Sequence, residues 1–313
     1  MSDRWMRDDY VDTLIELAEE NPELVLLEAD LMRASGTTRF RDRFPRRTFD
    51  VGVAEANMIG IASGLSAAGK IPFADSFAAF SSRRAYDQFY ISANYAGLRV
   101  KLVGTDPGIA AEYNGGTHMS FEDIGLMRSI PKLTISEPCD PVSLRALLPQ
   151  IARTPGCAYM RLHRKVAPVI YDETESFDLG RGKVLRDGKD LTIVFCGVML
   201  AAEVLAAGNL LANEGIEATI IDMHTIKPLD ADLIEEVARR TGAVLTCENH
   251  QISTGLGSAT AEVLSERIPT PLRRIGVTDE FGEVGPVEYL KKRYGLTSSD
   301  ICREAKNLLK LRL

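Results

Sequence analysis

Short apolar runs alternate with helical, amphipathic stretches along the first half of the chain. The apolar runs predict strands at 24–29, 71–75, 99–104, 132–137 and 158–162. The stretches between them predict helices near 8–20, 54–69, 82–95 and 141–153. An alternation of this kind is typical of a mostly parallel sheet that helices cover on both faces.

The stretch from His163 to Asp190 breaks this rhythm, because it is charged, rich in turn residues and poor in periodicity. We expect a linker over 166–190, with room for a small hairpin. The alternation then resumes, with strands expected at 191–197, 217–222 and 243–248 and helices at 199–214, 231–241 and 257–267. Thr297, with Asp300 three residues on, predicts the start of a last helix. The sequence therefore predicts an α/β protein of two domains with parallel or mixed sheets, at 1–165 and 191–313.

Composition narrows the class of protein. The chain has 313 residues, of which 45% are hydrophobic and 26% charged, as in an ordinary soluble protein. Its net charge is −7 and its Lys and Arg residues are scattered, which argues against a nucleic-acid or membrane surface. No apolar run reaches transmembrane length, and the polar start is not a signal peptide. The five cysteines form no CxxC pair and no metal spacing, so we expect reduced thiols, a cytoplasmic location and no metal ligands.

Glu55 is the first candidate for chemistry, in the run "DVGVAEANMIG". If a helix starts near Ala54, then Met58, Ile59 and Ala62 share a stripe with Glu55. A carboxylate over an apolar stripe is unfavourable unless something pairs with it. Glu55 is either an ordinary helix-start carboxylate, stabilised by about 0.3–1 kcal/mol from the helix dipole, or a buried group facing a ligand nitrogen.

Two further stretches admit both a structural and a functional interpretation. Phe77 and Phe80 lie one helical turn apart after a strand, either as core packing or as a platform for a flat heterocycle. The loop 105–123 holds three glycines, Asn114 and His118. It could be a plain turn with a surface histidine, or a place where backbone and imidazole approach a ligand.

Charged residues also follow several predicted strands. Arg161 and Arg164, in "YMRLHRK", form either a solvated edge or an anchor for a phosphate, carboxylate or sulfonate. Ligands of α/β proteins collect at the carboxyl ends of strands, where Asp30, Asp75 and Asp106 lie. We therefore expect the chemistry in the first domain. The segment "TGLGSAT" (254–260) is only weak evidence for a dinucleotide site.

Taken in order, several stretches resemble the C-terminal half of the transketolase family of thiamine diphosphate enzymes. They are "FDVGVAEANMIGIASGLSAAGKIPFADSFAAFSSRRAYDQ", "GGTHMSFEDIGLMRSIPKLTISEPCD", "IDMHTIKPLD" and "ENH". The resemblance implies a pyrimidine-binding domain followed by the family's C-terminal domain. It also implies that Glu55 is catalytic and shares a proton with N1′ of the cofactor's aminopyrimidine ring. Phe80, with Phe77 beside it, would form the aromatic floor under that ring.

The resemblance assigns further residues to the site. Asp30 matches a position near the cofactor, and His118 matches a catalytic-channel histidine that lies near substrate oxygens. Asn114 stands where transketolases usually carry an Asp that reads substrate hydroxyls. Asp106 stands where they carry a His, as in the 1-deoxyxylulose-5-phosphate synthases.

The same resemblance points to cationic residues for the substrate's tail. Arg164 and Arg7 match family positions that bind an anionic group. Arg83 or Arg84 holds a position that Tyr or Arg occupies in relatives, and the sequence does not decide between them.

One family feature is missing from the chain. The family binds the diphosphate through Mg²⁺ with a Gly-Asp-Gly motif and a later Asn in its N-terminal half, and Gly-Asp-Gly does not occur here. We expect the C-terminal subunit of a split transketolase, inactive alone, whose N-terminal partner supplies the Mg²⁺ ligands in an α₂β₂ assembly. Its reaction would move a two-carbon ketol unit from a ketose phosphate, or a similar anionic ketose, to an aldose. The alternatives are a relative of 1-deoxyxylulose-5-phosphate synthase or of 2-oxoacid dehydrogenase β subunits, and a non-catalytic assembly subunit.

Overall fold

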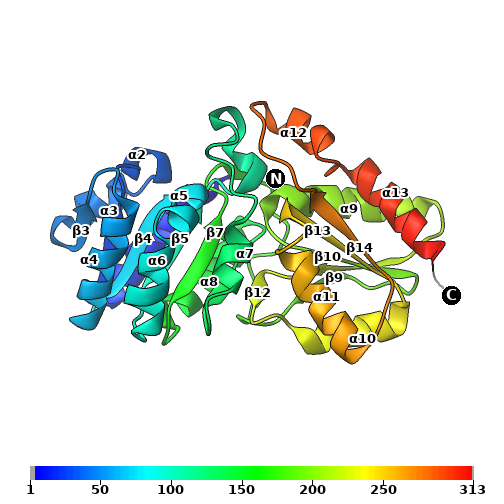
Figure 1. Cartoon of the computed structure of the whole chain (residues 1–313), viewed down its shortest axis with the longest axis horizontal. Coiled ribbons are helices and arrows are strands. Elements are labelled where there is room, and N and C mark those ends of the chain that lie inside the picture. Colours follow the sequence, from blue (N-terminus) through cyan, green and yellow to red (C-terminus); the bar gives the residue numbers. More distant parts are fainter. Residues whose placement is uncertain (1–3, 312–313) are drawn as a thin grey trace.

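The chain folds into two α/β units that lie side by side, each built on its own sheet (Figure 1). The computed structural model describes residues 4–311. Both sheets are mainly parallel, and the predicted α/β class is confirmed. In the described part of the chain, no helix is long and apolar enough to cross a membrane.

The first sheet carries the elements of the N-terminal half. Within residues 4–311 it contains seven strands, parallel except for β12, which runs antiparallel to β6. In spatial order they are β12 (Thr225–Lys227), β6 (Thr134–Ser136), β7 (Ala158–Leu162), β5 (Lys101–Thr105), β4 (Ile71–Phe77), β2 (Leu24–Glu28) and β3 (Thr48–Asp50). Since β12 comes from the second half of the sequence, the chain returns to complete the edge of its first sheet.

Helices cover both faces of this sheet. Helices α1 (Met6–Glu20) and α8 (Pro141–Arg153) pack together on one face, and α4 (Glu55–Ala67) packs on the other with the π-helical turn η2 (Phe89–Tyr95). The remaining elements are short: α2 (Met32–Ser35), α3 (Thr38–Arg43), η1 (Pro45–Arg47), α5 (Ala78–Arg83), α6 (Tyr86–Gln88), η3 (Gly108–Asn114) and α7 (Asp123–Arg128).

The helix expected at 82–95 is wrong in its start and its continuity. Helix α5 begins at Ala78, directly after β4, and ends at Arg83. The segment then continues as α6 and η2, where the Asn94 side chain donates to the carbonyl of Phe89 (2.8 Å) inside the π-helical turn. A side chain that bonds to the backbone in this way competes with the regular helical ladder.

The second sheet carries the C-terminal half. Its strands, in spatial order, are β14 (Leu272–Val277), β13 (Val244–Gln251), β10 (Leu191–Phe195), β11 (Ala218–Asp222) and β9 (Lys183–Arg186). The helices around it are α9 (Val198–Asn213), α10 (Ala231–Thr241), α11 (Leu256–Arg267), α12 (Val287–Arg293) and α13 (Ser298–Leu309). Thr297 and Asp300 form the capping box expected at the start of α13, which packs against α9.

The stretch 166–190 contributes two short strands, but they do not pair with each other. Strand β8 (Val166–Ala167) pairs with β1 (Arg4–Trp5), and β9 pairs antiparallel with β11. The small hairpin expected here is therefore absent from the described residues. Each strand instead attaches this stretch to a different part of the fold.

Candidate functional site

Glu55 is buried at the start of α4, as its sequence context predicts. Glu55 is 3% exposed, and Met58, Ile59 and Ala62 on the same stripe of the helix are all buried. The carboxylate accepts from the hydroxyl of Ser76 (3.4 Å) and from Arg84, whose Nη1 lies 3.2 and 3.3 Å from the two oxygens. In the structure, Glu55 thus faces a planar cation.

Phe77, Phe80 and His118 form an aromatic group beside Glu55. The two phenyl rings are 6.0 Å apart, and the His118 ring lies edge-on at 6.0 Å from Phe77 and 5.0 Å from Phe80. The Nδ1 of His118 is 2.8 Å from the Thr117 hydroxyl. Because β4 runs into α5 with no intervening loop, both rings lie at the carboxyl end of the sheet.

Arg84, and not Arg83, reaches this group. The Arg84 guanidinium lies 3.9 Å from the centroid of the Phe80 ring while it pairs with Glu55. Arg83 bonds instead to Glu122 (3.1 Å) and to the carbonyl of Thr117 (3.0 Å). The contacts decide between two neighbouring arginines that the sequence could not separate.

Arg7 and Arg164 converge on one carbonyl at the edge of the same region. Both donate to the oxygen of Ala34, at 3.2 and 3.1 Å. Arg164 also pairs with Asp106 (2.7 Å) and lies 5.5 Å from the Phe77 ring centroid. The backbone N–H of Arg7 donates to the carbonyl of Arg164, so the start of α1 and the end of β7 hold the two guanidiniums side by side.

Asp106 and Asp30 both have strained backbones at strand ends. Their φ angles are 51° and 61°, in the left-handed region that non-glycine residues rarely adopt. Asp106 is buried, and one of its oxygens has no hydrogen-bond partner among the described residues. Burial raises the pKa of Asp106, and the Arg164 charge opposes that rise. Asp30 lies exposed, with its backbone N–H bonded to Asp50 (3.0 Å).

Asn114 is exposed at the end of η3, where a loop of the second unit approaches. Gly115 has φ 71°, and Gly116 next to it faces the backbone of Gly282. A side chain at Gly115 would meet Val284 of that loop. Gly115 and Gly116 therefore permit a close contact between the two units.

Arg161 does not reach the site, so the interpretation of this residue as an anion anchor is wrong. It is fully buried and pairs with Asp123 and Glu137, both at 2.8 Å. Its Nη2 donates to the carbonyls of Ser120 (3.2 Å) and Asn249 (2.8 Å). Burial alone would lower the pKa of Arg161, but the two carboxylates raise it above its usual value.

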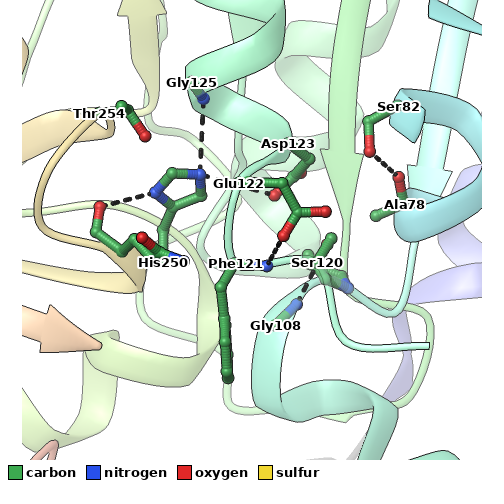
Figure 2. Close-up of polar contacts among 12 residues, drawn as sticks. Ala78, Ser82, Gly108, Ser120, Phe121, Glu122, Asp123, Gly125, His250 and Thr254 are labelled. Atoms are coloured by element: carbon green, nitrogen blue, oxygen red, sulfur yellow. Dashed lines mark hydrogen bonds and ion pairs between the residues drawn. The ribbon is translucent and has the colours of Figure 1, made fainter. Parts of the chain in front are cut away.

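Residues of both units meet around this arginine. Figure 2 shows His250 of β13 pointing at the first turn of α7, where its Nε2 lies 3.5 Å from the N–H of Gly125. Burial lowers the pKa of His250 to about 4, so the imidazole is neutral near pH 7. Arg161, Asp123 and Glu137 are a structural junction between the two sheets.

A second buried acidic group was missed from the sequence. Glu28 and Asp75 face each other across β2 and β4, both fully buried, and Tyr10 donates to Asp75 at 2.8 and 3.0 Å. Burial raises the pKa of Asp75 to about 8 and the pKa of Glu28 well above its usual range. Asp75 had a signal in its position at a strand end, but Glu28 sits inside an apolar run that is typical of a plain strand.

The glycine-rich segment "TGLGSAT" binds a carboxyl group of the protein itself. The Glu248 carboxylate accepts from the N–H groups of Leu256 (2.7 Å) and Gly257 (2.9 Å) at the start of α11. That helix end would otherwise suit a phosphate. Because Glu248 fills it and is fully buried, this segment is not a nucleotide site.

The residues around Glu55 fit a flat nitrogen heterocycle. A guanidinium already lies between Glu55 and Phe80, which shows that this place accepts a planar group with N–H donors and a stacking face. The same does not hold for a metal. Among residues 4–311, no group of three or more His, Cys, Asp or Glu side chains is arranged to hold an ion.

Comparisons with known proteins agree with this geometry. Residues 4–169 match the transketolase pyrimidine-binding domain, and residues 180–301 match the transketolase C-terminal domain. The sequence is 52% identical to the 6-deoxy-6-sulfo-D-fructose transketolase subunit SqwH of Clostridium sp. (strain MSTE9). That alignment covers 97% of this chain and 94% of the relative. It is 34% identical to a subunit of the apulose-4-phosphate transketolase of Phocaeicola vulgatus, over 97% of each chain.

A solved structure is similar along the whole chain. It is described as a split gene transketolase, inactive β4 tetramer, and matches with a TM-score of 0.92 at 42% identity. The match covers 99% of each chain.

Proposed function

The chain belongs to the transketolase family, and from that premise we propose that it is the C-terminal subunit of a split transketolase. With an N-terminal partner it would transfer a two-carbon ketol unit from an anionic ketose to an aldose. The observation that carries the proposal is the convergence of Glu55, Phe77, Phe80 and His118 at one end of the first sheet.

Glu55 is the residue we assign to proton transfer. Thiamine diphosphate, when bound, supplies the carbanion that carries the ketol unit. A buried carboxyl group beside an aromatic platform can hold a proton at a ring nitrogen that stacks on Phe80. The centroid of the His118 ring lies 5.0 Å from that of the Phe80 ring. We assign His118 to a contact with the substrate's oxygens. We assign Asn114, at the end of η3, to the substrate and Asp30, which follows β2, to the cofactor.

The Mg²⁺ ligands and the diphosphate site would come from the partner subunit. This assignment is supported by the missing Gly-Asp-Gly motif and by the similarity to a solved split gene transketolase. The structural relative is a tetramer of one chain type and is described as inactive, so we expect the same of this chain in isolation. An α₂β₂ assembly then places one cofactor at each contact between the two chain types.

The charges at Arg7, Arg164 and Asp106 favour a substrate with one negative charge. Two guanidiniums and one carboxylate leave a net charge of +1 where the two arginines meet at Ala34. A sulfonate carries a single negative charge, whereas a phosphate ester carries about −1.5 to −2 near pH 7. We therefore propose a ketose with a terminal sulfonate as donor, in agreement with the name of the relative at 52% identity.

Substrate preference is tested with two donors that differ in the anionic group alone. The assembled enzyme receives 6-deoxy-6-sulfo-D-fructose or D-fructose 6-phosphate, with the same aldose phosphate as acceptor. We expect kcat/KM to be at least tenfold higher for the sulfonate, and Arg164→Gln to remove most of that difference. Equal or reversed preference would refute the sulfonate assignment and leave the transketolase assignment standing.

The split enzyme is tested by isolating the chain from its native extract and sequencing what accompanies it. A second chain in equal amount, with Gly-Asp-Gly and a later Asn, is the expected result. Glu55→Gln in that complex should then reduce turnover by at least 100-fold, because the amide cannot share the proton. Full turnover by the Gln variant would support the non-catalytic alternative, and pyruvate as the preferred donor would support the synthase or dehydrogenase alternative.

A further inference from the structure

Arg84 contacts Glu55 and Phe80, the two residues that the proposed function assigns to binding the cofactor's ring. We propose that its guanidinium competes with the aminopyrimidine ring for Glu55 and Phe80, and must leave before thiamine diphosphate can bind. The inference rests on the proposed function and adds a residue that sets cofactor affinity. Two contacts carry it, one with the carboxylate and one with the aromatic ring.

The two contacts use the parts of the site that a heterocycle needs. Arg84 Nη1 reaches both oxygens of Glu55, at 3.2 and 3.3 Å. The guanidinium carbon is 3.9 Å from the Phe80 centroid, a distance at which flat groups stack in contact. No ring fits between two groups in contact, so Arg84 and a stacked pyrimidine exclude each other.

The guanidinium is also a chemical analogue of what it displaces. It is planar, carries N–H donors in its plane and stacks on aromatic faces. An aminopyrimidine shares these three properties. One pair of residues can therefore bind either group, which is the requirement for direct competition.

Charge adds a second reason for Arg84 to leave. Arg84 places its positive charge beside the Glu55 carboxylate, with 3.2 Å between Nη1 and Oε1. The role proposed for Glu55 instead requires a proton held between the carboxylate and a ring nitrogen. With Arg84 in place, its Nη1 contacts both carboxylate oxygens and competes with the ring nitrogen for them.

The two partners differ in their freedom to move. The side chain of Glu55 is 4% exposed, whereas that of Arg84 is 50% exposed at the end of α5. Arg84 can therefore swing into solvent without unpacking the core. The carboxylate and the phenyl ring would remain where the fold holds them.

When a side chain competes for a site, the apparent affinity equals the intrinsic affinity multiplied by the fraction of molecules in which that side chain has left. If Arg84 is displaced in about one molecule in ten, the apparent Kd for the cofactor is about tenfold higher than the intrinsic one. Removing Arg84 should then tighten binding by about that factor. A residue that simply contacts the bound cofactor would have the opposite effect.

The test is a titration of thiamine diphosphate, with Mg²⁺, into the complex of the full chain and its partner, followed by tryptophan fluorescence or calorimetry. We expect Arg84→Ala to lower the Kd about five- to tenfold. Arg84→Lys should lie between the two, because it keeps the charge near Glu55 but loses the flat stacking face. Arg41→Ala is the matched control, since Arg41 is exposed and bonds with its neighbour Asp42.

A structure of the loaded complex gives a second readout. We expect the guanidinium of Arg84 more than 4 Å from both oxygens of Glu55 and away from the Phe80 face. An unchanged or higher Kd in Arg84→Ala, or an Arg84 that still contacts both residues beside bound cofactor, would overturn the inference alone. If the wild-type complex binds no thiamine diphosphate, the proposed function fails, and the inference fails with it.

Discussion

The buried carboxyl groups of Glu28 and Asp75 make the stability of the fold depend on pH. Burial raises the pKa of Asp75 to about 8, and burial together with Asp75 raises the pKa of Glu28. The folded chain thus keeps a proton here that the unfolded chain releases above about pH 4. Because the folded state binds more protons between about pH 4 and 8, stability falls as pH rises through that range.

Asp75→Asn should flatten this dependence. The amide is neutral at every pH and its oxygen can still accept the Tyr10 hydroxyl, which bonds to Asp75 at 2.8 Å. The wild-type chain should lose up to about 1.4 kcal/mol of unfolding free energy for each pH unit across that range, and the variant clearly less. Urea unfolding at pH 5 and pH 8 measures both slopes. Asp42→Asn is the control, because Asp42 is exposed. Equal slopes in the wild-type chain and in Asp75→Asn would show that Asp75 does not hold the proton.

At the scale of single residues, the sequence predicts a group best where its neighbours along the chain define its surroundings. Glu55 was found because Met58, Ile59 and Ala62 lie on the same stripe of one helix. The burial of Glu28 beside another acidic residue was not predicted, because Asp75 lies 47 residues away on another strand. Only the register of the sheet places the two side by side. The same reason explains why Arg84 could not be chosen over Arg83 before the contact with Glu55 was seen.

At the scale of elements, α13 provides a local test of helix capping. The Thr297 hydroxyl accepts from the N–H of Asp300, and the Asp300 carboxylate accepts from the N–H of Thr297 (3.2 Å). Thr297→Ala removes half of this capping box and should lower the unfolding free energy by about 1 kcal/mol. Thr297→Ser keeps the hydroxyl and should restore most of the loss. Denaturant unfolding of both variants measures it, and equal losses would show that the methyl group, not the cap, stabilises this helix start.

Whole elements followed the sequence pattern where one periodicity persisted. The strands expected at 24–29 and 158–162 appear as β2 and β7, because their apolar runs are buried on both faces of the sheet. The region 82–95 failed, because its apolar spacing does not reveal the break between α5 and α6 or the π-helical turn. Strand β12 was not predicted for another reason: its pairing with β6 depends on a contact between segments about 90 residues apart.

At the scale of the whole molecule, the junction around Arg161 joins the two units. Arg161 comes from β7 of the first sheet, and one of its donors reaches the carbonyl of Asn249 on β13 of the second. Its carboxylate partners Asp123 and Glu137 are also buried. The sequence placed Arg161 in a basic cluster, since nothing in the local pattern shows that distant acidic residues surround it.

Removing Arg161 should therefore destabilise the chain far more than removing a surface arginine. Arg161→Met leaves two carboxylates buried without their cation, and the expected loss is about 3–5 kcal/mol of unfolding free energy. Arg239→Met is the control, because the Arg239 side chain is 66% exposed and pairs with Glu235 (2.8 Å) on the same surface helix. That variant should lose less than about 1 kcal/mol.

The triple variant Arg161→Met, Asp123→Asn, Glu137→Gln separates charge from shape. If the uncompensated charges cause the loss, neutralising both carboxyl groups should recover a large part of it, since buried ion pairs replaced together are often close to neutral in stability. If the loss persists, the hydrogen bond from Arg161 to the carbonyl of Asn249 holds the two units together, because the triple variant still lacks it. Chemical denaturation followed by both circular dichroism and fluorescence measures the loss. A single coincident transition in all variants would show that the units still unfold together.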